Sequence, residues 1–252
     1  RVFDSATLHL IRKFLQAGIM EKGLVKPNAI GMPQGGPLSP ILSNIYLDKF
    51  DKELEQRGLH FVRYADDSNI FVKSEMAANR VMKSVTSWLE RKLFLKVSAT
   101  KTKVVRPTNS NFLGFTYWKG SSKWECRPSN KSKRNLYDKC RKELIRKRCI
   151  ARTNTRTFTR INQIVRGWIN YFRIGRMKSF MDEFGQWLRH KIRVILFQQW
   201  KEPVRIYKNL QKLKVFVKAK NITDEDIYAT ANTRLGLYRQ AGMKTANYLI
   251  TP

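Results

Sequence analysis

Cysteine is scarce in this 252-residue sequence and poorly placed for either of its usual structural roles. Cys126, Cys140 and Cys149 are odd in number, widely spaced and form no Cys-x-x-Cys pair. That pattern argues against a disulfide framework and against a zinc site, and it is consistent with a reducing cytoplasm. Long apolar runs are missing as well. None approaches the roughly 20 residues needed to cross a bilayer, so no membrane-spanning segment is expected.

Acidic residues are the second shortage. The chain has 19 Asp and Glu against 50 Lys and Arg, which gives a formal net charge of +31. Such a balance points to a polyanionic partner, either nucleic acid or an acidic membrane surface. With 42% hydrophobic residues the chain is no disordered basic tail, and it is long enough for one large or two modest domains.

The charge is also uneven along the chain. Residues 1–120 hold 19 basic and 10 acidic side chains, whereas residues 121–252 hold 31 and 9. The plausible metal ligands lie in the first part. This division predicts catalysis in the first part and a nucleic-acid grip in the second, with the boundary at the Gly120-Ser121-Ser122 turn.

Two of the few acids are adjacent. Residues 61–72 contain two runs rich in apolar and β-branched residues, which predict a β-hairpin with its turn at Asp66-Asp67-Ser68-Asn69. Adjacent carboxylates repel one another, and Mg²⁺, which typically takes one or two carboxylates plus substrate phosphates, would remove that repulsion. For Asp-Asp alone a solvated turn is an equally good interpretation. Within Tyr64-Ala65-Asp66-Asp67, between two such strands, a metal site is favoured.

The rest of the first part alternates between helical and extended patterns. Apolar spacing predicts one helix over residues 5–17 and another after Ser74, which is its expected N-cap. A Gly- and Pro-rich turn leads into a further helix that Ser39 is expected to cap. Residues 112–118 alternate like a strand, in which Gly114 would leave room for a close neighbour.

Three segments of the second part have helical periodicity. Residues 131–152 carry ten Lys and Arg against two acids, so we expect phosphate contact rather than a merely solvated face. Residues 161–172 have an apolar face whose aromatic side chains should be core. In residues 180–200, Arg193 is expected to face outward. The candidate RNA-binding side chains are Arg141, Lys142, Arg146, Arg166, Asn170 and Arg173.

Five blocks, taken in this order, resemble those of the reverse transcriptases encoded by bacterial group II introns, especially the compact type without an endonuclease domain. They are residues 31–40, 64–67, 112–115, 166–172 and 232–234. The second block is similar to the metal-binding block of that family, and the third to its primer grip. The fourth resembles the signature of the maturase-specific thumb, or domain X. Together the blocks cover nearly the whole chain, and five in order are far more specific than one.

The resemblance implies an α+β fold. Residues 1–120 would be the carboxyl-terminal part of a right-hand polymerase palm, an antiparallel sheet with packed helices. Residues 121–252 would be an all-α three-helix thumb. The implied activity is Mg²⁺-dependent, RNA-directed DNA synthesis, in which paired ions stabilise the attacking and leaving oxygens of an in-line displacement.

The resemblance also assigns roles to particular residues. Asp66 would be the main metal ligand and Asp67 its helper, and Lys101 would neutralise the departing pyrophosphate. The residues bordering the nascent base pair or the primer end would be Pro33, Gln34, Gly35, Gly36, Tyr64, Phe112, Leu113 and Gly114. The implied partners are structured intron RNA, for splicing and retrohoming, an RNA template with a DNA primer, and deoxynucleoside triphosphates. A bacterial cytoplasmic location is implied, no membrane is involved, and a dimer is left open.

The sequence departs from the family pattern in two places. A further aspartate from an earlier palm strand would precede Arg1, as would the fingers, so the metal site would be completed outside this chain. Ser98-Ala99-Thr100 stands where the family usually has Asn and acidic residues. Two rival functions remain: a non-catalytic RNA-binding splicing factor with a vestigial polymerase site, and a reverse transcriptase domesticated for CRISPR adaptation or phage defence. Intact Asp66-Asp67 argues against the first, and flanking sequence would decide the second.

Overall fold

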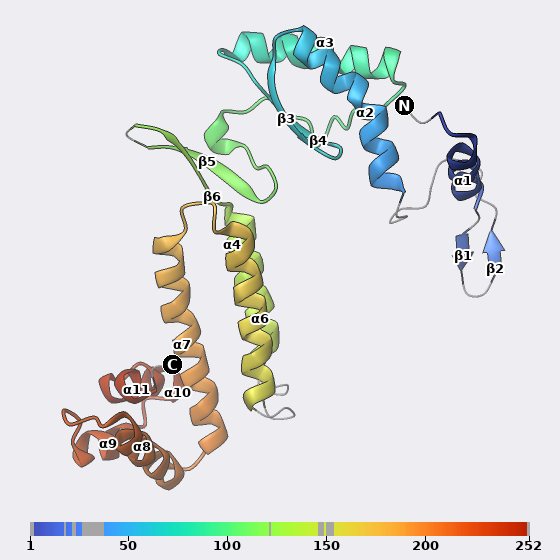
Figure 1. Ribbon diagram of the computed structural model, residues 1–252. Coiled ribbons are helices and arrows are strands. Elements are labelled where there is room, and N and C mark those ends of the chain that lie inside the picture. The colour runs from blue at the N-terminus through green and yellow to red at the C-terminus, as the bar shows by residue number, and fades with distance from the viewer. Residues whose placement is uncertain are drawn as a thin grey trace. The chain divides into compact units, whose positions relative to one another are not determined.

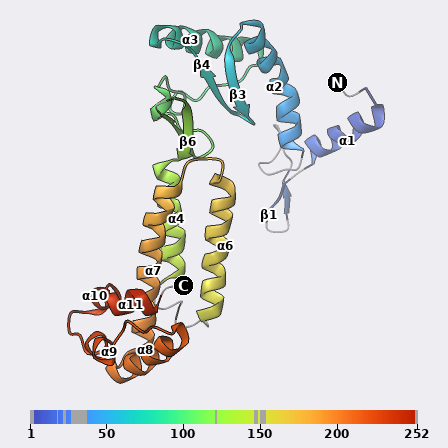
Figure 2. The same ribbon diagram turned by 60° about the vertical axis from the view of Figure 1, so that its left-hand side comes forward.

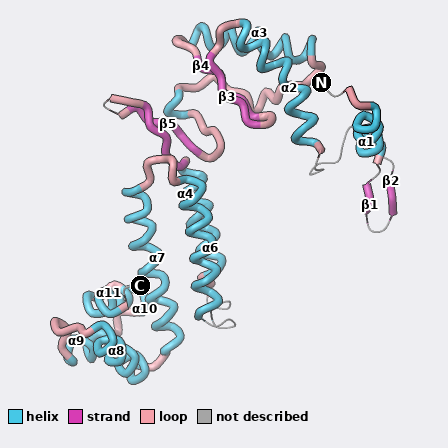
Figure 3. Tube along the Cα trace, viewed as in Figure 1, coloured by secondary structure: helices cyan, strands magenta, loops and turns pink. Residues whose placement is uncertain are grey.

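The computed structural model describes residues 3–17, 19–21, 24–26, 38–120, 122–145, 149 and 154–250. The chain divides into two compact units, Arg1–Val105 and Arg106–Pro252. Within the described ranges, strands occur as three antiparallel pairs and most other residues are helical, which confirms an α+β fold with small antiparallel sheets (Figure 3). No helix in the described part of the chain is long and apolar enough to span a bilayer.

The first unit combines helices with two short hairpins (Figure 1). Its elements are α1 (Ser5–Gln16), β1 (Ile19–Glu21), β2 (Leu24–Lys26), α2 (Ser39–Gln56), β3 (His60–Tyr64), β4 (Asp67–Phe71) and α3 (Glu75–Lys92). The Ser74 side chain accepts a hydrogen bond from the Ala77 N–H, which confirms the predicted cap of α3. The cap predicted for α2 was wrong. Leu38 already has helical dihedral angles, so Ser39 lies inside the first turn and makes no capping bond.

The core of the first unit is small. It is built around four buried residues of α2, α3 and the segment just after α3: Phe50, Leu54, Val85 and Leu93. Phe61 on β3 and Ile70 on β4 are direct cross-strand partners and pack against this cluster. The helices therefore cover one face of the β3–β4 hairpin. Val62 and Tyr64 alternate to the other face, where they are 48% and 63% exposed.

The second unit is a hairpin followed by helices. Its elements are the 3₁₀ turn η1 (Pro107–Asn109), β5 (Phe115–Lys119), β6 (Trp124–Pro128), α4 (Asn130–Glu143), α6 (Asn154–Phe172), α7 (Lys178–Trp200), α8 (Pro203–Val217), α9 (Asp224–Ala231), α10 (Leu237–Ala241) and α11 (Lys244–Leu249). Lys119 pairs with Trp124, so the predicted boundary falls between two paired strands. The compact unit begins before that hairpin, at Arg106.

The three long helices α4, α6 and α7 lie side by side in both ribbon views (Figures 1 and 2). Their shared core contains four buried residues: Leu136, Cys140, Phe180 and Phe184. The helical spacing of residues 131–152 predicts an inner face of Leu136, Cys140 and Leu144; the first two are fully buried, and Leu144 is partly buried. Burial raises the pKa of the Cys140 thiol to about 11. The helix predicted over residues 131–152 is shorter than expected, because α4 ends at Glu143.

A second core lies where α8 to α11 pack against the end of α7. Arg193 of α7 was predicted to face outward, and this was wrong, since the residue is only 6% exposed. Its guanidinium donates to the carbonyl oxygens of Ala241, at 3.3 Å, and Ile250, at 3.1 Å, and also to Asn247. Ala241 is the last residue of α10, and Ile250 is the C-cap of α11. The last carbonyl oxygens of a helix have no hydrogen-bond donor within the helix, and Arg193 supplies one. Burial lowers the pKa of Arg193.

Candidate functional site

The adjacent carboxylates lie at the tip of the β3–β4 hairpin. Residue pairs join the two strands from His60–Phe71 to Tyr64–Asp67, so the turn consists of Ala65 and Asp66 alone. The predicted turn was displaced by two residues, because Asp67 already belongs to β4. Of the two turn residues only Ala65 has a positive φ, 53°, and these φ signs are those of a type II′ hairpin turn.

Both carboxylates are open to solvent. Asp67 is the cross-strand partner of Tyr64, so the two side chains leave the same face of the hairpin, the one that the helices do not cover. Asp66, Asp67 and Tyr64 are all exposed. Among the described residues no ion pair engages either carboxylate. Their mutual repulsion is therefore not relieved by a neighbouring cation.

This donor set suits Mg²⁺. Two carboxylates without a counter-ion offer the oxygen ligands that this ion prefers, and it commonly completes its shell with substrate phosphates and water. The described part of the chain contains no group of three or more His, Cys, Asp or Glu side chains that could hold a metal by themselves. Asp66 and Asp67 therefore fit a shared site, in which other molecules or other residues supply the remaining ligands.

Arg63 lies directly behind the turn and connects it to α2. Its Nε donates to Asp51 at 2.7 Å, and its Nη2 makes a second bond to the same carboxylate. Its Nη1 donates to Asn44 Oδ1 at 2.9 Å and to the carbonyl oxygen of Ala65 at 2.8 Å. Hydrogen bonding to Asp51 raises the pKa of Arg63. Sequence reasoning missed this residue, although the alternation that buries Phe61 places Arg63 on the same face.

The other predicted residues of the first unit are less well connected to the carboxylates. Lys101 is exposed, and its backbone N–H donates to the Ser98 carbonyl at 3.2 Å. Within the described ranges, no hydrogen bond or ion pair joins Lys101 to Asp66 or Asp67. The predicted template-side residues Pro33, Gln34, Gly35 and Gly36 lie outside the described residues.

The predicted primer-grip block is a turn, not the start of a strand. Phe112 and Phe115 exchange backbone hydrogen bonds of 3.0 and 2.9 Å around Leu113 and Gly114. Leu113 has a φ of 52° and Gly114 a φ of 79°, the φ signs of a type I′ turn. The strand predicted over residues 112–118 therefore begins only at Phe115.

Side chains of α4 and α6 hold this second turn. The Tyr171 hydroxyl donates to the Leu113 carbonyl at 3.0 Å, and the Ser132 hydroxyl donates to the Gly114 carbonyl at 2.9 Å. A Cβ on Gly114 would lie 2.8 Å from Ser132 Oγ and 3.3 Å from the Phe172 ring, which confirms that glycine leaves room for a neighbour. The structure thus joins the block at 112–115 to the block at 166–172, about fifty residues later in the sequence.

The helix carrying the second of these blocks has the predicted faces. The Trp168 ring centroid lies 4.5 Å from that of Phe172 and 5.3 Å from that of Phe180, and its Nε1 donates to the Ser132 carbonyl at 3.3 Å. Trp168 and Phe172 therefore belong to the core, as predicted. The predicted RNA contacts on this helix are all exposed: Arg166, Asn170 and Arg173.

The basic face of α4 is solvent-exposed at its last turn. Arg141 forms an exposed ion pair with Asp138 at 3.1 Å, and its guanidinium lies 5.6 Å from the ring centroids of both Tyr137 and Trp187. Lys142 is exposed beside it. Arg146 lies outside the described residues. An exposed pair of this kind contributes little to stability, so Arg141 can exchange Asp138 for another anion.

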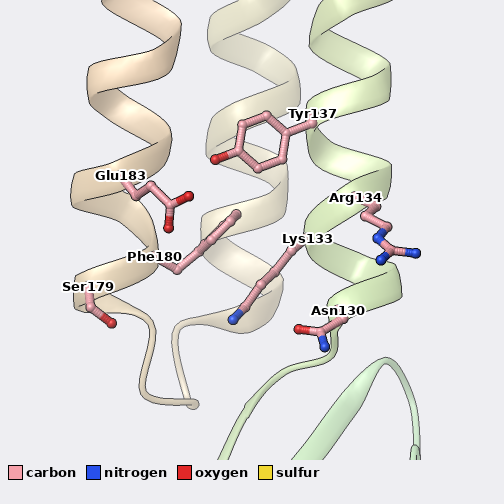
Figure 4. A pocket seen from close by; sticks show the side chains of 7 residues that line it. All are labelled: Asn130, Lys133, Arg134, Tyr137, Ser179, Phe180 and Glu183. Carbon is pink, nitrogen blue, oxygen red and sulfur yellow. The ribbon is translucent and has the colours of Figure 1, made fainter.

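A cavity of about 370 Å³ opens between α4 and α7 (Figure 4). It is lined by Asn130, Lys133, Arg134, Tyr137, Ser179, Phe180 and Glu183. The Lys133 ammonium lies 5.2 Å from the Phe180 ring centroid. In the described part of the chain, no hydrogen bond or ion pair uses the side chains of Lys133, Arg134 or Glu183. These polar groups are therefore free to meet a ligand.

A larger groove of about 960 Å³ follows the carboxyl-terminal half of α8. Its basic lining residues are Lys208, Lys212, Lys214, Lys218 and Lys220. The one acid that lines it, Asp224, is paired with Lys214 at 2.7 Å. Sequence reasoning did not single out these lysines, because they are spread over a helix and the loop that follows it.

Two family models match the chain. Residues 2–117 match the reverse transcriptases, the RNA-dependent DNA polymerases, and residues 133–214 match the maturase-specific domain of group II introns. The chain thus matches, in order, the reverse transcriptase and maturase domains found in group II intron-encoded proteins. The first match covers the first unit, with the β3–β4 hairpin, and reaches into β5, and the second runs from α4 through α6 and α7 into α8.

Several curated relatives share part of the chain. Protein YkfC of Escherichia coli (strain K12) is 29% identical over 41% of this chain and 36% of its own length. The putative COX1/OXI3 intron 2 protein of Saccharomyces cerevisiae is 34% identical over 42% of this chain and 12% of its own length. The group II intron-encoded protein LtrA of Lactococcus lactis subsp. cremoris is 43% identical over 25% of this chain and 10% of its own length. The chain therefore spans at most 36% of the length of these relatives.

Proposed function

We propose that this chain forms part of the palm, residues 1–120, and the thumb, residues 121–252, of an RNA-directed DNA polymerase that also binds intron RNA. The observation that carries the proposal is the exposed Asp66-Asp67 pair at a hairpin tip, without a counter-ion, in a segment that matches the reverse transcriptases. Neither carboxylate contributes to the core, so stability gives no reason for their adjacency.

Each residue near the hairpin tip has a part in this proposal. When bound, Mg²⁺ would stabilise charge on the attacking and leaving oxygens of the displacement at the α-phosphate. Asp66 and Asp67 would hold it, together with an aspartate that the family resemblance places outside this chain. Tyr64, exposed on the same face as Asp67, would support the primer end. Lys101 would neutralise the departing pyrophosphate.

The primer grip would be the turn at residues 112–114. Its two carbonyls accept hydrogen bonds from Tyr171 and Ser132, so helices of the second unit fix its backbone. A backbone element held in one conformation can position a primer without a large loss of entropy on binding. Gln34, Gly35 and Gly36 would border the nascent base pair on the template side.

The second unit would grip nucleic acid through phosphates. Residues 106–252 hold 33 Lys and Arg against 9 Asp and Glu. Arg141, Lys142, Arg166 and Arg173 are exposed, and Lys133 and Arg134 line the cavity between α4 and α7 (Figure 4). Phosphate contacts position a strand without reading its sequence, which suits structured RNA recognised by shape.

Primer extension on an RNA template tests the proposal, using the complete reading frame that contains this chain. Asp66→Asn keeps the size of the side chain and removes its charge. We expect extension to fall by at least about 10²- to 10³-fold, as when one charge-stabilising group is lost from an active site. Substantial extension by Asp66→Asn would contradict the assignment of the metal site.

A non-catalytic splicing factor is the second candidate, and the match of residues 133–214 to the maturase-specific domain favours it. The same experiment separates the two functions. If the wild-type protein binds intron RNA and supports splicing but extends no primer on any RNA template, it is a splicing factor and the polymerase function is rejected.

A further inference from the structure

Arg63 is bound on three sides, in a way that a merely structural ion pair does not require. Its side chain is 11% exposed, and its guanidinium contacts Asp51 and Asn44, seven residues apart on one face of α2. The remaining contact is to the backbone of the hairpin tip, through the Ala65 carbonyl at 2.8 Å. The guanidinium is thus a bridge from a core helix to the turn that carries the carboxylates.

The contact to Ala65 acts on the peptide that leads into Asp66. Ala65 has a φ of 53°, a left-handed conformation that costs an L-residue about 1–2 kcal/mol. Its carbonyl group shares a peptide plane with the Asp66 N–H, so a donor fixed to α2 sets the orientation of that plane. The direction in which the Asp66 carboxylate leaves the turn depends on the same plane.

The charge of Arg63 matters as much as its geometry. Asp51 binds the guanidinium through two of its nitrogens, which neutralises the cation on the helix-covered side of the hairpin. An unpaired arginine three residues from Asp66 would instead compete with a metal for the carboxylates. Asp51 and Arg63 together therefore hold the turn without quenching its negative charge.

We propose that Arg63, anchored by Asp51, is the positioning residue of the Asp66-Asp67 metal site. This inference rests on the function proposed above and adds a residue that does not touch the metal. Lysine cannot replace Arg63, because one ammonium group lacks the planar fork that reaches Asp51, Asn44 and the Ala65 carbonyl together.

The test is a titration of the protein encoded by the complete reading frame that contains this chain with Mn²⁺ alone, monitored by NMR line broadening of the backbone amides of residues 65–69. In the wild type these amides should broaden selectively, and Asp66→Asn should abolish the effect. Arg63→Gln and Arg63→Lys should each raise the half-saturating Mn²⁺ concentration about tenfold, the lower end of the loss seen when groups that orient metal ligands are removed. Asp51→Asn should shift it in the same direction.

Arg57→Gln is the matched control. Arg57 also pairs with an acid of α2, Glu53 at 2.7 Å, and donates to Ser84 on α3 at 2.8 Å, but it does not touch the turn. The half-saturating Mn²⁺ concentration of Arg57→Gln should stay within about twofold of the wild-type value. Thermal melting of each variant shows whether weaker Mn²⁺ binding comes from unfolding or from a displaced turn in a folded protein. The double variant Arg63→Gln/Asp51→Asn should be no worse than Arg63→Gln, because the two residues act as one unit.

The outcomes distinguish this inference from the function on which it rests. If Asp66→Asn abolishes broadening while folded Arg63→Gln and Arg63→Lys bind Mn²⁺ like the wild type, the metal site stands and Arg63 has no positioning role. If the wild type shows no selective broadening, or Asp66→Asn leaves it intact, the metal site itself is refuted and the role of Arg63 with it.

Discussion

Two tight turns of this protein are built alike and used differently. Ala65-Asp66 and Leu113-Gly114 are both two-residue turns, and both contain a non-glycine residue with positive φ. The first leaves its acidic side chains in solvent, and its carbonyl contact comes from within the same hairpin, through Arg63. The second is enclosed by α4 and α6, which supply side-chain hydroxyls to its carbonyls and a ring against Gly114.

The difference suggests that the side chains of the first turn serve a ligand, whereas those of the second turn stabilise the fold. Side chains at the first turn can change without disturbing a core, so their identity is free to serve a ligand. At the second turn each change meets packed atoms of the helices, so side-chain identity there is set by the fold. The familiar sequence blocks therefore carry two kinds of information, and the predictions below test that division.

The largest loss of stability is expected from Trp168→Ala, behind the second turn. Trp168 packs on Phe172 and Phe180, and deletion of such a core aromatic typically costs about 3–5 kcal/mol. Denaturant unfolding measures the change, and RNA affinity should fall only as the fold fails. Unchanged stability with weaker RNA binding would make Trp168 a stacking platform and reverse the two faces of α6.

Gly114→Ala is expected to come next. A Cβ there would meet Ser132 Oγ at 2.8 Å in a backbone with a φ of 79°, so strain and overpacking add to a loss of about 2–4 kcal/mol. Gly58→Ala is the matched control, because Gly58 has a φ of 65° but no atom within 4 Å of a Cβ. It should lose only about 1–2 kcal/mol. Equal losses in unfolding experiments would show that packing around the second turn is unimportant.

Ala65→Gly should have a small effect of the opposite sign. Glycine relieves the left-handed strain at a φ of 53°, about 1–2 kcal/mol, and loses about 0.4–1 kcal/mol through greater freedom of the unfolded chain. The free energy of unfolding should therefore rise by up to about 1.6 kcal/mol. A clear destabilisation would mean that the first turn is as tightly packed as the second.

The smallest effect concerns the salt dependence of RNA binding. For single strands, log K against log salt has a slope of about −0.7 per neutralised phosphate. Replacing Arg141, Lys142 and Arg146 with Gln should make the slope shallower by up to about two units, with similar losses across unrelated sequences. The control is the same exchange at Arg80, Lys83 and Arg91, exposed on α3. An equal change of slope in the control would show that the grip is not localised in the second unit.

The sequence predicted most of what depends on local pattern. Apolar alternation located the β3–β4 hairpin, and helical spacing separated the core face of Trp168 from the exposed face of Arg166. What it missed depends on partners distant in sequence. Nothing near Arg193 reveals that its acceptors are the carbonyls of Ala241 and Ile250.

The two turns show the same limit. Residues 112–114 were assigned to a strand because their alternation continues into β5, whereas the hydroxyls that hold the turn come from Ser132 and Tyr171. Arg63 was overlooked because a basic residue in a strand reads as solvated unless an acid is known to lie on the covering helix. Asp51 supplies that acid, and only the packing of α2 on the hairpin brings it into contact.

The measurement closest to the central claim compares stability and RNA affinity of Asp66→Asn with those of the wild type, in the same preparation of residues 1–252. The variant removes a charge from an exposed, uncompensated pair, so melting should be unchanged or slightly higher, and the RNA dissociation constant should stay within about twofold, a difference of about 0.4 kcal/mol. A marked loss of either stability or RNA affinity would contradict the account, since the carboxylates would then serve the fold or the grip rather than a metal.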